Sequence, residues 1–160
     1  MRVFHPHGSK ERLLEMVQKV SGIHLNEGLN VSGVHLNEGL LPQEKKIELI
    51  NKFVTYAVEK LKIKSAPEIV ISNDEKEAET MKSFGGFNPE SKKIRVVIAN
   101  RNLADALRTL AHELVHYMQF LNGKIKPESG ETGSDEENEA NSLAGVLMRE
   151  FGRANSIIFE

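Results

Sequence analysis

The sequence predicts an α+β fold in which a small sheet packs against helices. Residues 93–99 (Lys-Ile-Arg-Val-Val-Ile-Ala) are rich in β-branched side chains, which is typical of a strand. Residues 103–121 repeat leucine at helical spacing, and residues 135–151 repeat small and apolar residues in the same way. Both segments therefore predict amphipathic helices. We expect one further helix and two further strands upstream of them, giving a three-stranded sheet.

The upstream elements follow from the same patterns. Residues 43–62 predict a helix with apolar residues on one side, and residues 67–72 (Pro-Glu-Ile-Val-Ile-Ser) predict a strand. Residues 80–87 predict a second strand or a turn, where Gly85 and Gly86 bend the backbone. The sequence Asn88-Pro89 predicts a turn before the strand at 93–99, which we expect to form an edge of the sheet.

The chain divides at about residue 41. Residues 42–160 are expected to form the main domain, and residues 1–41 an N-terminal helix followed by an arm. The helix is predicted from Ser9 to Val20, with Leu13, Leu14, Met16, Val17 and Val20 as its apolar residues.

The arm contains a near-repeat with a period of 11 residues: Ser-Gly-Ile-His-Leu-Asn-Glu-Gly-Leu at 21–29 and Ser-Gly-Val-His-Leu-Asn-Glu-Gly-Leu at 32–40. Two glycines in each copy argue against a helical repeat. His24, Glu27, His35 and Glu38 leave open a role in metal binding or in covering an active site. We favour a loosely packed arm.

Composition narrows the classes of function. At 160 residues the chain is long enough for one compact domain. Its net charge of −2 indicates no nucleic-acid surface, and zero cysteines exclude disulfides and thiolate metal ligands. No apolar run approaches the length of a membrane span, and the first residues lack the apolar core of a signal peptide. We therefore expect a cytoplasmic protein without a membrane or nucleic-acid partner.

The most informative motif is His112-Glu113-Leu-Val-His116, inside the helix predicted at 103–121. Histidines four residues apart lie one above the other on a helix, about 6 Å apart along its axis. Zinc can bridge two such imidazoles, and a carboxylate between them can act as general base toward a zinc-bound water. The leucine stripe lies on the opposite side of this helix, so a pair of solvated surface histidines is the alternative. We favour the metal site, with Glu113 as its base.

A third metal ligand is needed, and the sequence limits the choice. Cysteine is absent and no histidine follows His116, so a carboxylate remains. The helix predicted at 135–151, capped by Ser134, carries Glu137, with Glu136 as the alternative ligand and Glu139 expected to be solvated. The same residues form a possible capping box, in which Glu137 would instead bond back to the Ser134 backbone.

This pair of helices resembles the gluzincin class of zinc metallopeptidases, in which His-Glu-x-x-His is followed by Glu-x-x-x-Asp or Glu-x-x-x-Asn on a second helix. Glu137-Asn-Glu-Ala-Asn141 matches that pattern. The resemblance implies a minimal zincin-like domain, zinc ligated by His112, His116 and Glu137, and Asn141 supporting His112. The run is also similar to the corresponding helix of the ImmA/IrrE group. Because Arg149 follows Leu147-Met148 where that group has proline, the regulator cleavage typical of that group is not implied.

The expected activity is hydrolysis of a peptide or protein substrate by a zinc-activated water, with Glu113 as general base. Tyr117 is expected to pack rather than to contact the reacting carbonyl. The N-terminal segment also resembles proteins of tailed phages, which would place the chain in a host cytoplasm or a virion. Two alternatives remain: a phage structural or interaction module stabilised by zinc without catalysis, and a zinc amidase that cleaves peptidoglycan.

Overall fold

The computed structural model describes residues 23–25, 42–125 and 132–160. Within them the fold is α+β, as the sequence predicts. Four helices are present in these ranges: α2 (Gln43–Lys60), α3 (Glu75–Met81), α4 (Leu103–Leu121) and α5 (Asp135–Ala154), followed by the short 3-10 helix η2 (Ser156–Phe159). The strands are β1 (Ile23–Leu25), β2 (Glu68–Ser72), β3 (Gly85–Asn88) and β4 (Lys93–Val97).

The strands form one mixed sheet in the order β1-β2-β4-β3. β1 and β4 both pair in parallel with β2, with Ile23 opposite Ile69 and Ile69 opposite Ile94. β3 and β4 form an antiparallel hairpin connected by the turn at residues 89–92. The three strands expected from the sequence are therefore present, and a fourth, β1, comes from the first copy of the near-repeat.

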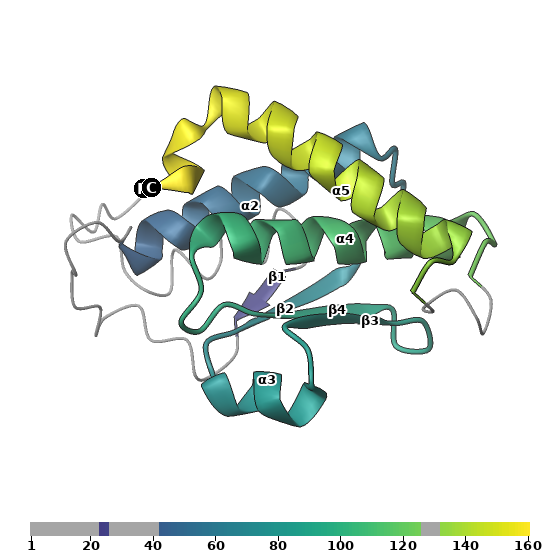
Figure 1. Ribbon diagram of the computed structural model, residues 1–160, viewed down its shortest axis with the longest axis horizontal. Helices are drawn as coiled ribbons and strands as arrows, with labels where there is room; N and C mark the ends of the chain where they lie inside the picture. Colours follow the sequence, from purple (N-terminus) through teal and green to yellow (C-terminus); the bar gives the residue numbers. More distant parts are fainter. Residues whose placement is uncertain (1–22, 26–41, 126–131) are drawn as a thin grey trace, which may run out of the picture.

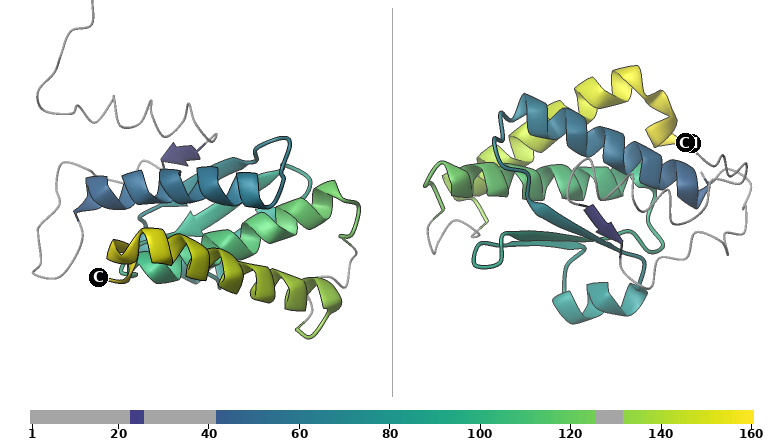
Figure 2. Two further views of the ribbon diagram at one scale, coloured as in Figure 1. Left: turned by 90° about the horizontal axis from the view of Figure 1, so that it is seen from above. Right: turned by 180° about the vertical axis from the view of Figure 1, so that it is seen from behind.

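Helices cover the two faces of the sheet unequally. Figure 1 shows α2, α4 and α5 on one side and the short α3 on the other. Viewed from above, α4 lies between α2 and α5 along much of its length (Figure 2). The core lies between this helical layer and the sheet; Phe53 of α2, Ile69 of β2 and Leu107 of α4 are each completely buried. This packing holds α4 and α5 against each other, which positions the site described below.

The helices end and begin where the sequence provides caps. Asn102 accepts a hydrogen bond from the backbone N–H of Asp105 at the start of α4. Ser134 accepts one from the backbone N–H of Glu137 at the start of α5, as expected. α2 ends at a Schellman motif, in which the N–H of Lys62 bonds to the Glu59 carbonyl and the N–H of Ile63 to the Val58 carbonyl.

Two expectations about the sheet region were wrong, and one short helix was not predicted. The strand at 93–99 is not an edge: β4 ends at Val97 and lies between β2 and β3, because the hairpin adds β3 to its outer side. Gly85 and Gly86 lie within β3 rather than at a bend. α3 was not predicted, although Asp74 caps it by accepting a hydrogen bond from the Lys76 backbone. No residue of this short helix is buried, so it lacks the apolar periodicity that predicts helices.

Other expectations concern residues outside the described ranges. These are the helix predicted from Ser9 to Val20, the second copy of the near-repeat, and Glu27, His35 and Glu38. Among the helices that the structure describes, none is both long enough and apolar enough to cross a membrane.

Candidate metal centre

Three side chains from α4 and α5 direct one group each toward a common point. The Nε2 atoms of His112 and His116 lie 3.0 Å apart. The carboxylate oxygens of Glu137 lie 3.1 Å from Nε2 of His112 and 3.2 Å from Nε2 of His116. The histidines occupy successive turns of α4, and Glu137 lies in the first turn of α5. The three residues expected as ligands are thus brought together, and they could hold a metal ion.

Gln119 determines which nitrogen of His116 is available to a metal. Its side chain is completely buried, and its amide nitrogen donates to the Glu136 carbonyl at 2.9 Å and to the Glu139 carboxylate at 3.0 Å. Its amide oxygen therefore faces Nδ1 of His116, 2.9 Å away. Because that oxygen only accepts, Nδ1 must carry the proton, and the lone pair of Nε2 points toward Glu137.

His112 is held in a half-buried position by α5. Burial lowers the pKa of its imidazole, and the neighbouring His116 lowers it further. The Glu137 carboxylate and a hydrogen bond with the Asn141 side chain act in the opposite direction. The net effect favours the neutral imidazole, which is the form that binds metals. Asn141 therefore contacts His112, as the resemblance implied.

The side chain of Glu137 faces the histidines of α4 rather than the start of its own helix. Its backbone N–H donates to the Ser134 hydroxyl, but its carboxylate faces the two imidazoles. The reciprocal half of a capping box is therefore not made by this side chain. Glu136 lies outside the cluster and contributes its backbone carbonyl to Gln119. Glu139, expected to be solvated, is instead part of the contact with Gln119, because α5 packs closely on α4.

Glu113 is a buried carboxyl beside this cluster. Its residue is 9% exposed, and burial raises the pKa of its carboxyl from 4.5 to about 7. Glu137 raises this pKa further, whereas His116 lowers it. A carboxyl whose pKa lies near neutrality can accept and release a proton at physiological pH, which is the property that a general acid–base group requires.

Gly85 allows the sheet to approach α4 at this point. A Cβ atom at residue 85 would lie 2.5 Å from Cγ2 of Thr109 and 3.6 Å from Cγ of Glu113. Any larger residue would therefore push β3 away from the helix. The outer strand of the sheet runs directly past Glu113 for this reason. The sequence marked Gly85 only as a turn signal, because close approach between segments distant in the chain is not encoded in local pattern.

Tyr117 packs in the core, as expected, and its hydroxyl does not point toward the three candidate ligands. It is buried, and its hydroxyl donates to the Ser65 carbonyl at 2.7 Å. Its ring packs edge-on against Phe87 of β3, with centroids 5.6 Å apart. Phe87 also packs against Phe120. These aromatic contacts fix β3 against the C-terminal half of α4.

The spacing of the donor atoms fits a small tetrahedral ion. Bonds of about 2.0–2.1 Å at tetrahedral angles place ligand atoms roughly 3.3 Å apart. The observed separations among Nε2 of His112, Nε2 of His116 and the Glu137 oxygens are 3.0, 3.1 and 3.2 Å. Two imidazoles that direct their Nε2 atoms at one carboxylate form a donor set of two nitrogens and one oxygen. Such a set suits zinc and leaves a fourth position for water.

Comparisons of the chain with protein-family models, with curated proteins and with solved structures found no match.

Proposed function

We propose that this chain is a zinc-dependent peptidase of the gluzincin type. The observation that carries the proposal is the convergence of His112, His116 and Glu137 from two helices, with the buried carboxyl of Glu113 beside them. His112, His116 and Glu137 would hold the ion. A purely structural zinc site needs a fourth protein ligand and no neighbouring base, whereas the described residues offer three candidate ligands with the buried carboxyl of Glu113 beside them.

The ion, when bound, would supply Lewis-acid chemistry that polarises the scissile carbonyl and makes water a nucleophile near neutral pH. The chain's own residues perform the proton transfers. Glu113 accepts the proton of the attacking water and passes it to the nitrogen of the leaving amine. Burial of Glu113 excludes solvent that would otherwise compete for this proton.

Among the strands that the structure describes, β3 forms the outer edge on one side of the sheet, and this edge is the proposed binding surface for the substrate. β3 is the last strand in the sheet order, and its inner side pairs with β4. An extended peptide can add to such an edge through backbone hydrogen bonds. Because Gly85 brings β3 against Glu113, a peptide on this edge would lie next to the proposed base. This position replaces the edge that the sequence suggested at residues 93–99.

Metal analysis of three purified proteins tests the site. The wild type should retain close to one zinc per chain, and Glu137→Ala should retain much less. Glu136→Ala is the matched control, because it removes a neighbouring carboxylate in the same helical turn without touching the cluster. Equal zinc in all three proteins, or none in the wild type after reconstitution, would contradict the proposed ligand set.

Hydrolysis of a generic unfolded protein tests the activity. Wild-type turnover should be abolished by a chelator and restored by zinc, whereas Glu113→Gln should bind zinc without turnover. Undiminished turnover in Glu113→Gln would refute the role of Glu113. Stoichiometric zinc with no hydrolysis of protein would favour a zinc-stabilised interaction module, and release of fragments from purified peptidoglycan alone would favour an amidase.

A further inference from the structure

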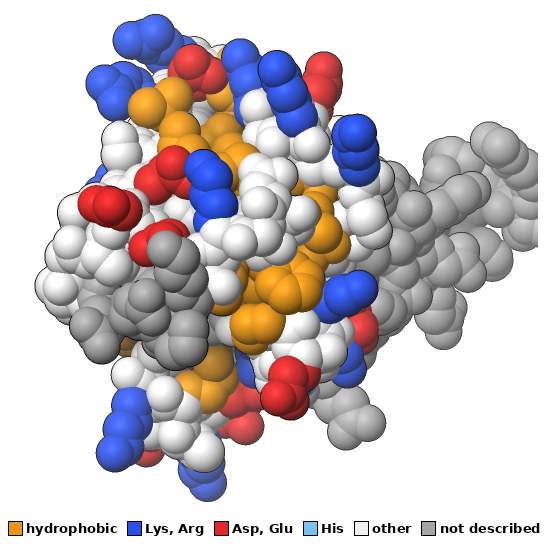
Figure 3. All heavy atoms as spheres, turned by 90° about the vertical axis from the view of Figure 1, so that its right-hand side faces the viewer, with side chains coloured by type: hydrophobic (Ala, Val, Ile, Leu, Met, Phe, Trp, Pro, Cys, Tyr) orange, Lys and Arg blue, Asp and Glu red, His pale blue; other side chains and the backbone are white. Residues whose placement is uncertain are grey.

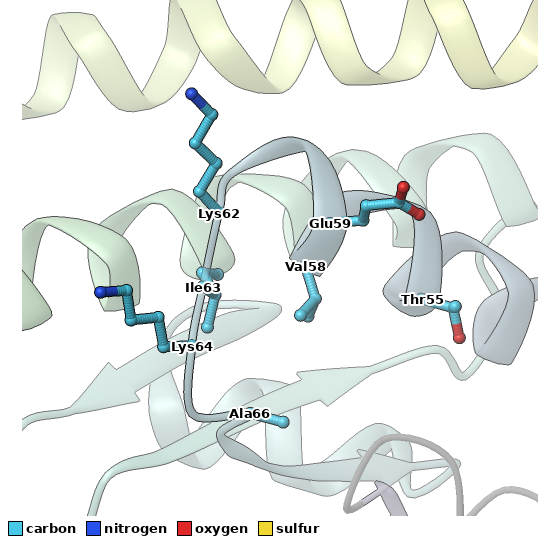
Figure 4. Close-up of a pocket in the computed structure, with 7 residues that line it drawn as sticks. All are labelled: Thr55, Val58, Glu59, Lys62, Ile63, Lys64 and Ala66. Atoms are coloured by element: carbon cyan, nitrogen blue, oxygen red, sulfur yellow. The ribbon is translucent and has the colours of Figure 1, made fainter.

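A groove lies at the end of α2, where the chain leads into β2. It has a volume of about 440 Å³ and is lined by the last turns of α2 and the connection to β2. Figure 4 shows the side chains of Val58, Ile63 and Ala66 directed into the hollow, while the ammonium groups of Lys62 and Lys64 point away from it. The groove therefore has an apolar floor and a charged rim.

The floor of the groove is fixed by the backbone. The Schellman motif at the end of α2 joins the N–H of Ile63 to the carbonyl of Val58 at 3.0 Å. This motif commonly brings the two side chains into contact. It also requires a left-handed residue, which is Lys62 with φ of 54°. Figure 3 shows the face that contains the end of α2, where hydrophobic side chains remain visible between Lys and Arg side chains. An apolar segment would find preformed contacts there.

The start of β1 pairs with the strand that follows this groove. β1 is parallel to β2, with Ile23 opposite Ile69, so the chain enters both strands at the same end of the sheet. Ala66 in the groove lies three residues before Ile69, and Val20 lies three residues before Ile23. Three residues of extended chain span only about 10 Å. The segment that ends at Val20 is therefore short-tethered to a point from which it can reach the groove.

The composition of that segment matches an apolar groove. Residues 9–20 carry five apolar residues at helical spacing, and only Ser21 and Gly22 separate them from β1. A helix of 12 residues is marginally stable alone in water and needs a surface on which to bury its apolar side. We infer that residues 9–20 of the same chain form an amphipathic helix that docks into the groove formed by Val58, Ile63 and Ala66.

The proposed docking also bears on the role of the N-terminal segment. β4 separates β2 from β3 in the strand order, so the groove at the entry to β2 is distinct from the sheet edge next to Glu113. A helix seated there completes the hydrophobic packing at the β1 edge and leaves the β3 edge open. Residues 9–20 are then part of the domain and do not cover the candidate metal centre.

Pairwise disulfide formation tests this docking in the full chain, which contains no cysteine of its own. Ala66→Cys would be combined in turn with Val17→Cys, Val20→Cys, Gln18→Cys and Glu11→Cys. Val17 and Val20 lie on the apolar side of the predicted helix, and Gln18 and Glu11 lie on the other side. Under mild oxidation the two apolar-side pairs should form an intramolecular disulfide at least tenfold faster than the two polar-side pairs.

Several results would overturn the inference. Equal rates at all four positions would indicate an undocked segment, and no disulfide at any position would place the segment elsewhere. Disulfides formed only between chains would indicate that the groove is occupied by a second copy. As a second measurement, Val17→Asp should lower the melting temperature while Gln18→Asp should not. Equal melting temperatures for these two variants would contradict docking.

Discussion

Replacing Glu113 by glutamine should make the metal-free protein more stable at neutral and alkaline pH. The pKa of this carboxyl rises from 4.5 to about 7 on folding, mainly because it is buried. Glutamine has nearly the same shape and no charge, so it removes the penalty of burying an ionised group. One pKa unit corresponds to about 1.4 kcal/mol, so the full effect on the free energy of unfolding is roughly 3 kcal/mol.

The stability advantage of Glu113→Gln should increase with pH. Between pH 4.5 and 7 the folded chain binds the Glu113 proton and the unfolded chain releases it. The contribution of this residue to wild-type stability therefore falls as pH rises through that range. Above about pH 7 both states are ionised and the penalty is complete. The glutamine variant has no such group, so its advantage should be greatest at pH 8 and should vanish near pH 4.5.

Urea denaturation in the presence of a chelator provides the measurement, with wild type and Glu113→Gln compared at pH 5, 6, 7 and 8. An advantage for the variant that grows over this range would agree with a buried carboxyl that becomes ionised. A difference that does not change with pH, or a variant less stable than wild type at pH 8, would refute the reasoning. The same variant should be inactive with zinc bound, so catalysis and stability should change in opposite directions.

Three further substitutions test the packing around the site and the groove. Gln119→Ala should weaken zinc binding by about 10- to 100-fold, because it removes the group that orients a ligand imidazole, and competition with a chromogenic chelator would measure this. Gly85→Ala should destabilise the fold by about 1–3 kcal/mol, because its Cβ would collide with Thr109. The matched control, Gly86→Ala, should be far milder, since the nearest atom to its Cβ is 3.8 Å away. Lys62→Gly should raise the free energy of unfolding by about 1 kcal/mol, because φ of 54° strains a residue with a side chain. Urea denaturation would measure the stability of Gly85→Ala, Gly86→Ala and Lys62→Gly. Equal stability of Gly85→Ala and Gly86→Ala would contradict the close approach of β3 to α4.

The positions of most residues in the candidate site could be predicted from the sequence, because these positions follow from helical periodicity. The positions of His112, Glu113 and His116 on one turn of helix follow from their spacing alone. The identity of the third ligand was limited to Glu136 or Glu137, and a rotation of one residue within the first turn of α5 decides between them. Only the packing of α5 on α4 sets that rotation, and it directs Glu137 toward the histidines.

The role of Gln119 could not be predicted from helical periodicity. Gln119 follows His116 by three residues, so it lies near the histidines on α4, but this spacing does not reveal its function. That function depends on the Glu136 carbonyl and the Glu139 carboxylate of another helix, which together fix the orientation of its amide. Hydrogen bonds between segments far apart in the chain leave no periodic signal.

By itself the sequence determined the helices and strands with strong hydrophobic periodicity, the α+β class, and the two histidines and Glu113 of the candidate metal centre. These properties arise from local spacing, which each segment carries independently of the others. The tertiary structure decided the order of the strands, the edge position of β3 and the proton assignment of His116. It also decided that Ile23–Leu25 joins the sheet. These properties depend on which segments meet in space, and that is set by the simultaneous burial of all apolar faces in one core.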